Sequence, residues 1–347
     1  MSYLLHFVKY LPCTLEAQNF NMYAVFLNHY MLTYVLFAIG FVFLIKGADY
    51  LVDGSSSIAQ RIGISQLVIG LTIVSFGTSA PELIVNIMAS LKGAGDIGIG
   101  NVLGSNIANI LLILGVAGVI YPLRIQKSTT WKEVPLNFLS AFVLLALAND
   151  VIIDGASSSV ISRIDGIILM LFFVIFVYYT IGLAKAEKSN DGNTKKYSIL
   201  KSVIMVVVGI VGLAFGGQWV VNGAVEIAAY FGLSQALIGL TIVAVGTSLP
   251  ELATSAVAAY KRNADIAIGN VVGSNLFNIF WVLGLSALIK PLPFRSEINT
   301  DILVYLAAAL LLFLFAFTGK KEHVSRSDGV IFLCCYGAYL VFLIIRG

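Results

Sequence analysis

The chain has 347 residues, of which 59% are hydrophobic and only 11% are charged, and its mean hydropathy is +0.94. An average soluble chain carries about 25% charged residues, so this composition cannot cover a water-facing surface and predicts a polytopic membrane protein in a lipid bilayer. The net charge of +3 excludes a nucleic-acid footprint. The three cysteines and three histidines lie outside the polar motifs described below, which excludes a disulfide framework, a zinc site and a haem site.

Stretches of roughly 20 apolar residues predict membrane-spanning helices, and on that scale the chain contains ten. Their expected limits are 31–51, 65–90, 97–120, 134–149, 165–184, 199–230, 234–259, 266–289, 301–318 and 329–345. We therefore expect four segments: an N-terminal extension over 1–30, a first half over 31–184, a linker over 185–198 and a second half over 199–347. Residues 1–30 show no clean signal peptide, and a start at Met22 or Met31 stays open.

Basic residues are distributed unevenly over the predicted loops. The side that holds both termini carries six lysines and arginines, and the opposite side carries fourteen. Because basic loops stay in the cytoplasm, this asymmetry predicts a cytoplasmic linker at 185–198 and both termini outside.

An internal repeat links the two halves. Residues 47–115 align without a gap to 216–284 at a constant offset of 169, and 35 of the 69 aligned positions are identical. Since each half has five predicted spans, an odd number, the second half must enter the membrane upside down. The expected fold class is therefore an all-α integral membrane protein whose ten transmembrane helices form two inverted-topology five-helix repeats. This architecture is typical of secondary transporters with a site at the midplane.

Two of the 18 acidic residues, Glu82 and Glu251, fall in the middle of a span. An ionisable group there costs at least about 2.5 kcal/mol and indicates function. The two are repeat equivalents, so a pseudo-two-fold axis would bring them together, where they repel unless a cation or a proton lies between them. No basic residue occupies a matching central position, because Lys46 is the nearest and its counterpart is Phe215.

Neutral oxygen donors surround both glutamates in the sequence. Hydroxyl residues three and four positions earlier share a helical face with each glutamate, and the following span adds a serine and an asparagine spaced i and i+4. These are Thr78, Ser79, Ser105 and Asn109 in the first half, and Thr247, Ser248, Ser274 and Asn278 in the second. Pro81 and Pro250 are expected to free backbone carbonyls in 75–77 and 244–246. Carboxylates with neutral oxygens, and no histidine or cysteine, indicate a site for a hard cation such as Ca²⁺ or Na⁺.

Four other asparagines in these motifs are ambiguous. Hydrogen bonding between helices explains them as well as ion binding does. They are Asn101, Asn106, Asn270 and Asn275.

The motifs GTSAPE with GNVLGSNIAN, and GTSLPE with GNVVGSNLFN, resemble the paired alpha repeats of the sodium/calcium exchangers of the Ca²⁺/cation antiporter superfamily. The resemblance covers most of 31–347 and implies two long gating helices, the first and sixth spans, that slide against a bundle of eight. It implies that Ca²⁺ and Na⁺ share the two glutamates, with the hydroxyl and amide residues above as further ligands. It also implies that Ser75 and Ala244 contribute backbone carbonyls.

One position departs from the family pattern, because many members carry Asp where this chain has Asn278. The missing charge leaves stoichiometry, potassium dependence and electrogenicity open. The short linker resembles that of small prokaryotic-type members, so we expect a bacterial or archaeal cell membrane and no regulatory calcium domain.

The sequence predicts antiport of Ca²⁺ against Na⁺ by alternating access, with no cofactor and no obligate protein partner. Exchange of Ca²⁺ or another cation against H⁺ through the same glutamates is the alternative, and Mg²⁺ or Mn²⁺ as the transported ion also stays open. A passive channel is a less favoured possibility. An intramembrane enzyme would need a catalytic pair such as Asp–Asp or Ser–His, or a zinc motif, and the spans contain none, so an enzyme is not expected.

Overall fold

The computed structural model of the chain describes residues 14–93, 95–125, 131–186, 197–232, 244–318 and 323–346. The first half contains α2 (Thr14–Ile62), α3 (Gln66–Ile69), the π-helical turn η2 (Gly70–Val74), α4 (Ser75–Thr78), α5 (Ala80–Lys92), α6 (Gly95–Ala108), the π-helical turn η3 (Asn109–Ile113), α7 (Leu114–Ile120), β1 (Leu123–Arg124), α9 (Glu133–Leu147), α10 (Asp150–Ile153), β2 (Ser159–Ile161) and α11 (Arg163–Ala186).

The second half contains α12 (Ile199–Tyr230), α14 (Ala244–Gly246), α15 (Leu249–Tyr260), α16 (Ala264–Leu276), the π-helical turn η5 (Phe277–Leu283), α17 (Gly284–Ile289), β3 (Leu292–Phe294), the 3₁₀ turn η6 (Ser296–Ile298), α18 (Asn299–Thr318), β4 (His323–Val324) and α19 (Arg326–Arg346).

Seven helices of the described part are long and apolar enough to cross a membrane, and the bent pair Gln66–Thr78 and Ala80–Lys92 makes an eighth. The fourth predicted span is the shorter helix Glu133–Leu147. The seventh falls partly on 233–243, outside the described residues. The first span begins at Met31 as predicted but continues to Ile62 instead of ending at 51, within the longer helix α2. The molecule is therefore a helical membrane protein, and the count of ten stays a prediction.

Local signals in the sequence explain several helix ends. The side chains of Ser65 and Asn263 accept hydrogen bonds from the third backbone N–H that follows, at 3.4 and 3.2 Å, and so begin α3 and α16. Ser198 does the same for α12 at 3.3 Å. Gly93 ends α5 with φ of +76°, a left-handed conformation that favours glycine.

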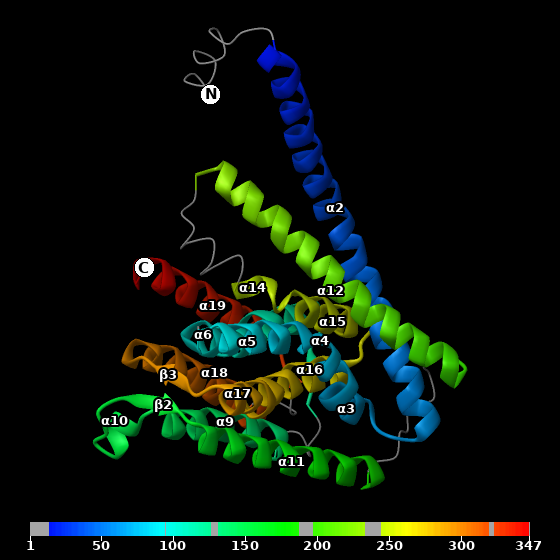
Figure 1. Ribbon diagram of the computed structural model, residues 1–347. Coiled ribbons are helices and arrows are strands. Elements are labelled where there is room, and N and C mark those ends of the chain that lie inside the picture. Colours follow the sequence, from blue (N-terminus) through cyan, green and yellow to red (C-terminus); the bar gives the residue numbers. More distant parts are fainter. Residues whose placement is uncertain are drawn as a thin grey trace.

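The two longest helices, α2 and α12, cross each other along one side of the molecule (Figure 1). Glycines line their contact: a Cβ on Gly40 would lie 2.9 Å from the carbonyl oxygen of Gly216, and one on Gly47 would lie 2.9 Å from that of Gly209. The four glycines are repeat equivalents in pairs, at the offset of 169. Because glycine has no side chain, the two backbones approach to contact distance.

The helices that carry the motifs repeated between the two halves lie inside the bundle. Most of 95–120 and 264–289 is buried, whereas α11, α12 and α19 expose most of their surface. In Figure 1, α9 and α11 lie on the side of the bundle away from α2 and α12. The polar motifs are thus enclosed by protein, and the outer helices present the apolar surface expected towards lipid.

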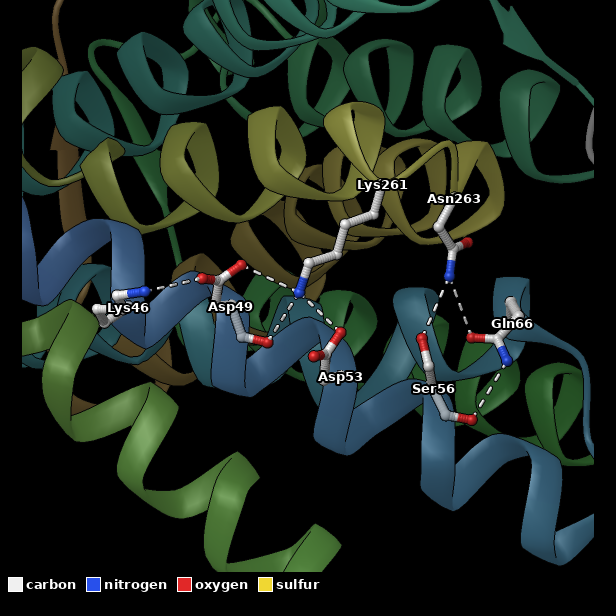
Figure 2. A network of polar contacts seen from close by, with 7 residues as sticks. All are labelled: Lys46, Asp49, Asp53, Ser56, Gln66, Lys261 and Asn263. Carbon is white, nitrogen blue, oxygen red and sulfur yellow. Dashed lines mark hydrogen bonds and ion pairs between the residues drawn. The ribbon is translucent and has the colours of Figure 1, made fainter. Parts of the chain in front are cut away.

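A polar network joins α2 to the connection between α15 and α16 (Figure 2). Lys261 Nζ lies 3.0 Å from Asp49 Oδ1 and 2.7 Å from Asp53 Oδ1. One turn further, Asn263 Nδ2 donates to Ser56 Oγ at 3.2 Å and to Gln66 Oε1 at 3.3 Å. These contacts tie the second half of α2 to α15, which carries Glu251, and to the start of α16.

Two short antiparallel strand pairs were not predicted from the sequence. β1 pairs with β4, and β2 pairs with β3, so each pair joins the two halves of the chain. A two- or three-residue strand carries too little alternation for a sequence pattern to reveal it.

Candidate cation site

The helices that carry the two glutamates are broken at equivalent serines. Ser79 has φ and ψ of −84° and 4°, and Ser248 has −89° and 6°. A proline follows each of these residues in the first turn of α5 or α15, where its missing N–H breaks no helical hydrogen bond. The segments before and after Ser79 meet at 46°. The helices therefore break at Ser79 and Ser248, and the expected freeing of backbone carbonyls in 75–77 and 244–246 stays a prediction.

Glu82 and Glu251 lie in the first turns of α5 and α15, with 0% and 1% of their surface exposed. Their carboxyl groups are close enough to interact electrostatically, as the sequence predicted for repeat equivalents. Among the ion pairs of the described residues, none includes either glutamate, and Lys46 lies 3.8 Å from Asp49 instead. Within the described part of the chain, the two acids thus form no ion pair with a basic residue.

Hydroxyl groups from both halves contact Glu251. Ser79 Oγ donates to Glu251 Oε1 at 3.0 Å, and Ser274 Oγ donates to the same oxygen at 3.4 Å. The first contact crosses from α4–α5 to α15, so the two broken helices face each other. The second oxygen, Oε2, has no hydrogen-bond partner within the described part of the chain.

Glu82 has the same kinds of neighbouring residue as Glu251, but its hydrogen bonding differs. Ser105 and Thr247 are its neighbouring hydroxyl groups, yet neither carboxyl oxygen accepts a hydrogen bond from any described residue. Thr247 Oγ1 donates instead to Asn101 Oδ1 at 3.3 Å. The equivalent bond in the other half runs from Thr78 Oγ1 to Asn270 Oδ1 at 3.0 Å.

Asn109 is the first residue of the π-helical turn η3, and Asn278 lies within the π-helical turn η5. Both are buried, and the Oδ1 atom of each has no partner among the described residues. π-helical turns inside α-helices occur frequently at functional sites. The sequence predicted membrane spans over 97–120 and 266–289 but gave no indication of these turns, since one extra residue in a turn leaves no mark on hydrophobic periodicity.

The structure does not single out the two backbone carbonyls, of Ser75 and Ala244, that the family resemblance implies as ligands. The Ser75 carbonyl accepts the Ser79 N–H at 2.9 Å and lies 3.3 Å from Thr78 Oγ1. Ala244 is the first residue of α14. Their role as ligands stays a prediction.

Seven buried oxygens of the predicted site residues lack a hydrogen-bond donor within the described part of the chain. They are both carboxyl oxygens of Glu82, Oε2 of Glu251, the hydroxyls of Ser105 and Ser248, and Oδ1 of Asn109 and of Asn278. A buried acceptor without a partner costs about 1–3 kcal/mol, more if it is charged. A cation would compensate that cost for several oxygens at once.

The ligand set restricts which cation fits. The described residues contain no group of three or more His, Cys, Asp and Glu side chains that could hold a metal ion. The two carboxylates and the neutral oxygens around them are a ligand set that would suit Ca²⁺ or Na⁺ better than a thiolate- or imidazole-seeking metal.

Comparison with known proteins agrees with this chemistry. The family model described as "Sodium/calcium exchanger protein" matches residues 32–182 and 201–345. The chain is 37% identical over 315 residues to "Putative antiporter CaxA" of Alkalimonas amylolytica, covering 88% of this chain and 96% of that protein. It is 33% identical over 344 residues to "Sodium/calcium exchanger MaX1" of Methanosarcina acetivorans, covering 89% and 98%.

Solved structures match as well. A structure of the sodium-calcium exchanger NCX_Mj soaked with Na⁺ and Ca²⁺ superposes with a TM-score of 0.76 at 32% identity, covering 89% of this chain and 98% of that one. The match of the family model to most of the chain, together with these relatives, shows that this chain belongs to the sodium/calcium exchanger family.

Proposed function

We propose that this protein exchanges Ca²⁺ for Na⁺ across the membrane by alternating access, at a site between the two broken helices. Two of its relatives described above are named as an antiporter and as a sodium/calcium exchanger. The observation that carries the proposal is the set of seven buried, donorless oxygens around Glu82 and Glu251.

The charge of the proposed site supports coupling of Ca²⁺ transport to Na⁺ transport. Two buried carboxylates carry a charge of −2, which one Ca²⁺ or two Na⁺ would neutralise. Ca²⁺ and a full complement of Na⁺ would compete for the same oxygens. An emptied, doubly charged site would be costly to move through a low-dielectric barrier, because desolvation of the two carboxylates is uncompensated. Such a site changes sides only when it is loaded, and this requirement prevents leak.

The paired features of the two halves support the inverted-repeat architecture that we propose with this function. The breaks at Ser79 and Ser248 and the glycines of the α2–α12 crossing lie at equivalent positions of the two halves, and each strand pair joins one half to the other. We further propose ten spans, a cytoplasmic 185–198 linker and outside termini, on the asymmetry of lysine and arginine in the loops.

The test is uptake of ⁴⁵Ca²⁺ into proteoliposomes loaded with Na⁺, at equal pH on both sides. We expect uptake that requires the outward Na⁺ gradient in the native protein and that is lost in Glu82→Gln and in Glu251→Gln. Glu297→Gln is the control, because Glu297 is exposed in a turn outside the site and its loss leaves transport unchanged.

Uptake that ignores Na⁺ and follows an imposed pH gradient would replace this proposal with Ca²⁺/H⁺ exchange through the same glutamates. Competition by Mg²⁺ and Mn²⁺ in the same assay identifies the transported ion. Absence of uptake under both gradients, in folded protein, would refute transport of Ca²⁺.

A further inference from the structure

Four buried asparagines form two hydrogen-bonded pairs between the halves. Asn109 Nδ2 donates to Asn275 Oδ1 at 2.9 Å, and Asn278 Nδ2 donates to Asn106 Oδ1 at 3.1 Å. At the offset of 169, Asn106 corresponds to Asn275 and Asn109 to Asn278, so the two pairs are repeat equivalents. Each pair contains one predicted cation ligand and one residue that the sequence left ambiguous.

The backbone carbonyl of Asn275 fixes the orientation of the Asn106 amide, and Asn106 in turn fixes that of Asn278. Asn106 Nδ2 donates to the carbonyl oxygen of Asn275 at 3.2 Å. Because a carbonyl oxygen only accepts, the nitrogen of the Asn106 amide must face it, and Oδ1 of Asn106 must face Asn278. Asn278 must then turn its own nitrogen towards Asn106. Its Oδ1 therefore points elsewhere, and it meets no donor in the described part of the chain.

Packing behind Asn106 supports this orientation. The side chain of Tyr305, from α18, interacts with Asn106. The Tyr305 hydroxyl in turn lies 2.9 Å from Asn137 Oδ1 and 3.1 Å from Ser140 Oγ, both on α9. All four side chains are fully buried. Buried polar side chains thus enclose Asn106 from the side of α9 and α18 and oppose its rotation.

The equivalent pair lacks such an anchor. The Nδ2 atom of Asn275 has no hydrogen-bond partner among the described residues. The amides of Asn109 and Asn275 can therefore both reverse and still keep a hydrogen bond between them. Asn109 can present to the site either an oxygen or an N–H group, whereas Asn278 is held with its oxygen exposed to the site.

We propose that Asn106 is a positioning residue for the cation: it fixes Asn278 as an oxygen ligand before the ion arrives. This inference rests on the proposed function. The orientation matters because an amide binds a cation only through its oxygen, and the reversed amide presents two N–H donors that repel it. Fixing the group in advance also removes the entropy cost of ordering it during binding.

The experiment measures equilibrium ⁴⁵Ca²⁺ binding to purified protein without Na⁺, beside Na⁺-driven uptake. We expect Asn106→Ala to weaken Ca²⁺ binding about 10-fold, the lower end of the effect of losing a group that orients a metal ligand. The matched control is the repeat equivalent, Asn275→Ala, for which we expect less than about a threefold loss because its partner is not held in one orientation. Asn106→Leu fills the space without accepting a hydrogen bond and should reproduce the loss.

A double-mutant cycle separates positioning from a general structural role. In the Asn278→Ala background, Asn106→Ala should cause no further loss of Ca²⁺ binding, because no ligand remains to be oriented. Additive losses, or equal losses in Asn106→Ala and Asn275→Ala, would overturn the inference. Native protein that binds Ca²⁺ but shows no Na⁺-driven uptake would refute the proposed exchange and leave the positioning role standing.

Discussion

Ser79 Oγ donates a hydrogen bond to Glu251 Oε1 over 3.0 Å, and this contact joins a residue at the break of one half to the central acid of the other. Its repeat equivalent is absent within the described residues, because the Ser248 hydroxyl has no partner and Glu82 accepts no hydrogen bond. The two halves thus supply similar groups but use them differently.

This asymmetry predicts different effects of two equivalent mutations. Ser79→Ala should lower the stability of the ion-free protein by about 1.5–3 kcal/mol, the value of a hydrogen bond to a charged group. Ser248→Ala should not lower it, since its hydroxyl makes no hydrogen bond within the described part of the chain. Thermal unfolding without Ca²⁺ and Na⁺ measures this difference. Both variants should weaken Ca²⁺ binding, and equal ion-free stabilities would contradict the asymmetry.

The aspartates of the ion pairs in Figure 2 have no charged equivalent at the repeat-related positions. Lys261 pairs with Asp49 and Asp53, while the positions equivalent to these aspartates are Gln218 and Asn222. Each partly exposed pair contributes about 0.2–1 kcal/mol. Lys261→Gln should therefore lower the unfolding temperature slightly, and its repeat equivalent Lys92→Gln should not.

High salt provides the internal check on that result. Screening weakens exposed ion pairs, so the difference in unfolding temperature between native protein and Lys261→Gln should shrink as NaCl is raised. A difference that is independent of salt would show that Lys261 acts through packing of its side chain and not through its charge.

The glycine contact between α2 and α12 is sensitive to a single methyl group. A Cβ on Gly47 would lie 2.9 Å from both the Gly209 oxygen and the Leu213 nitrogen, and backbone atoms cannot move aside. Gly47→Ala should cost about 1–3 kcal/mol of stability, as overpacking does. Gly182→Ala is the control, because nothing lies within 4 Å of its added Cβ. Equal unfolding temperatures for the two variants would contradict close backbone contact.

The carboxylate of Asp301 is paired with Arg346, at the C-terminal end of α19. Arg346 donates to both of its carboxyl oxygens, at 3.2 and 3.0 Å, and Tyr339 donates to it at 3.0 Å. Asp301 is 7% exposed, so Arg346→Gln leaves a nearly buried charge without its partner. We expect a loss of about 3 kcal/mol, at the lower end of the range for breaking a buried pair.

Removing the second charge should restore part of that loss. The double variant Asp301→Asn with Arg346→Gln should unfold at a higher temperature than Arg346→Gln alone, because no unpaired charge remains. If the double variant is no more stable than Arg346→Gln, Arg346 stabilises the protein through packing of its side chain and not through its charge.

The amino-acid sequence by itself determined the membrane class, most of the spans, the repeat at an offset of 169 and the family. These properties depend on composition and on local pattern, since about 20 apolar residues suffice to cross a bilayer wherever they occur. The sequence also singled out Glu82 and Glu251, because a carboxylate in an apolar span is costly in any fold. Its assignment of the surrounding oxygens to one cation site stays a prediction that the geometry supports.

Tertiary structure alone decided which groups bond across the halves. No sequence pattern indicates that Ser79 contacts Glu251, that the helices break at the serines and not earlier, or that Asn109 and Asn278 lie in π-helical turns. The repeat predicts symmetry, yet the structure holds Asn278 through Asn106 and leaves Asn109 without an equivalent anchor. Hydrogen-bond direction depends on atoms brought together from residues more than 160 positions apart, and only the packed helices place those atoms within reach.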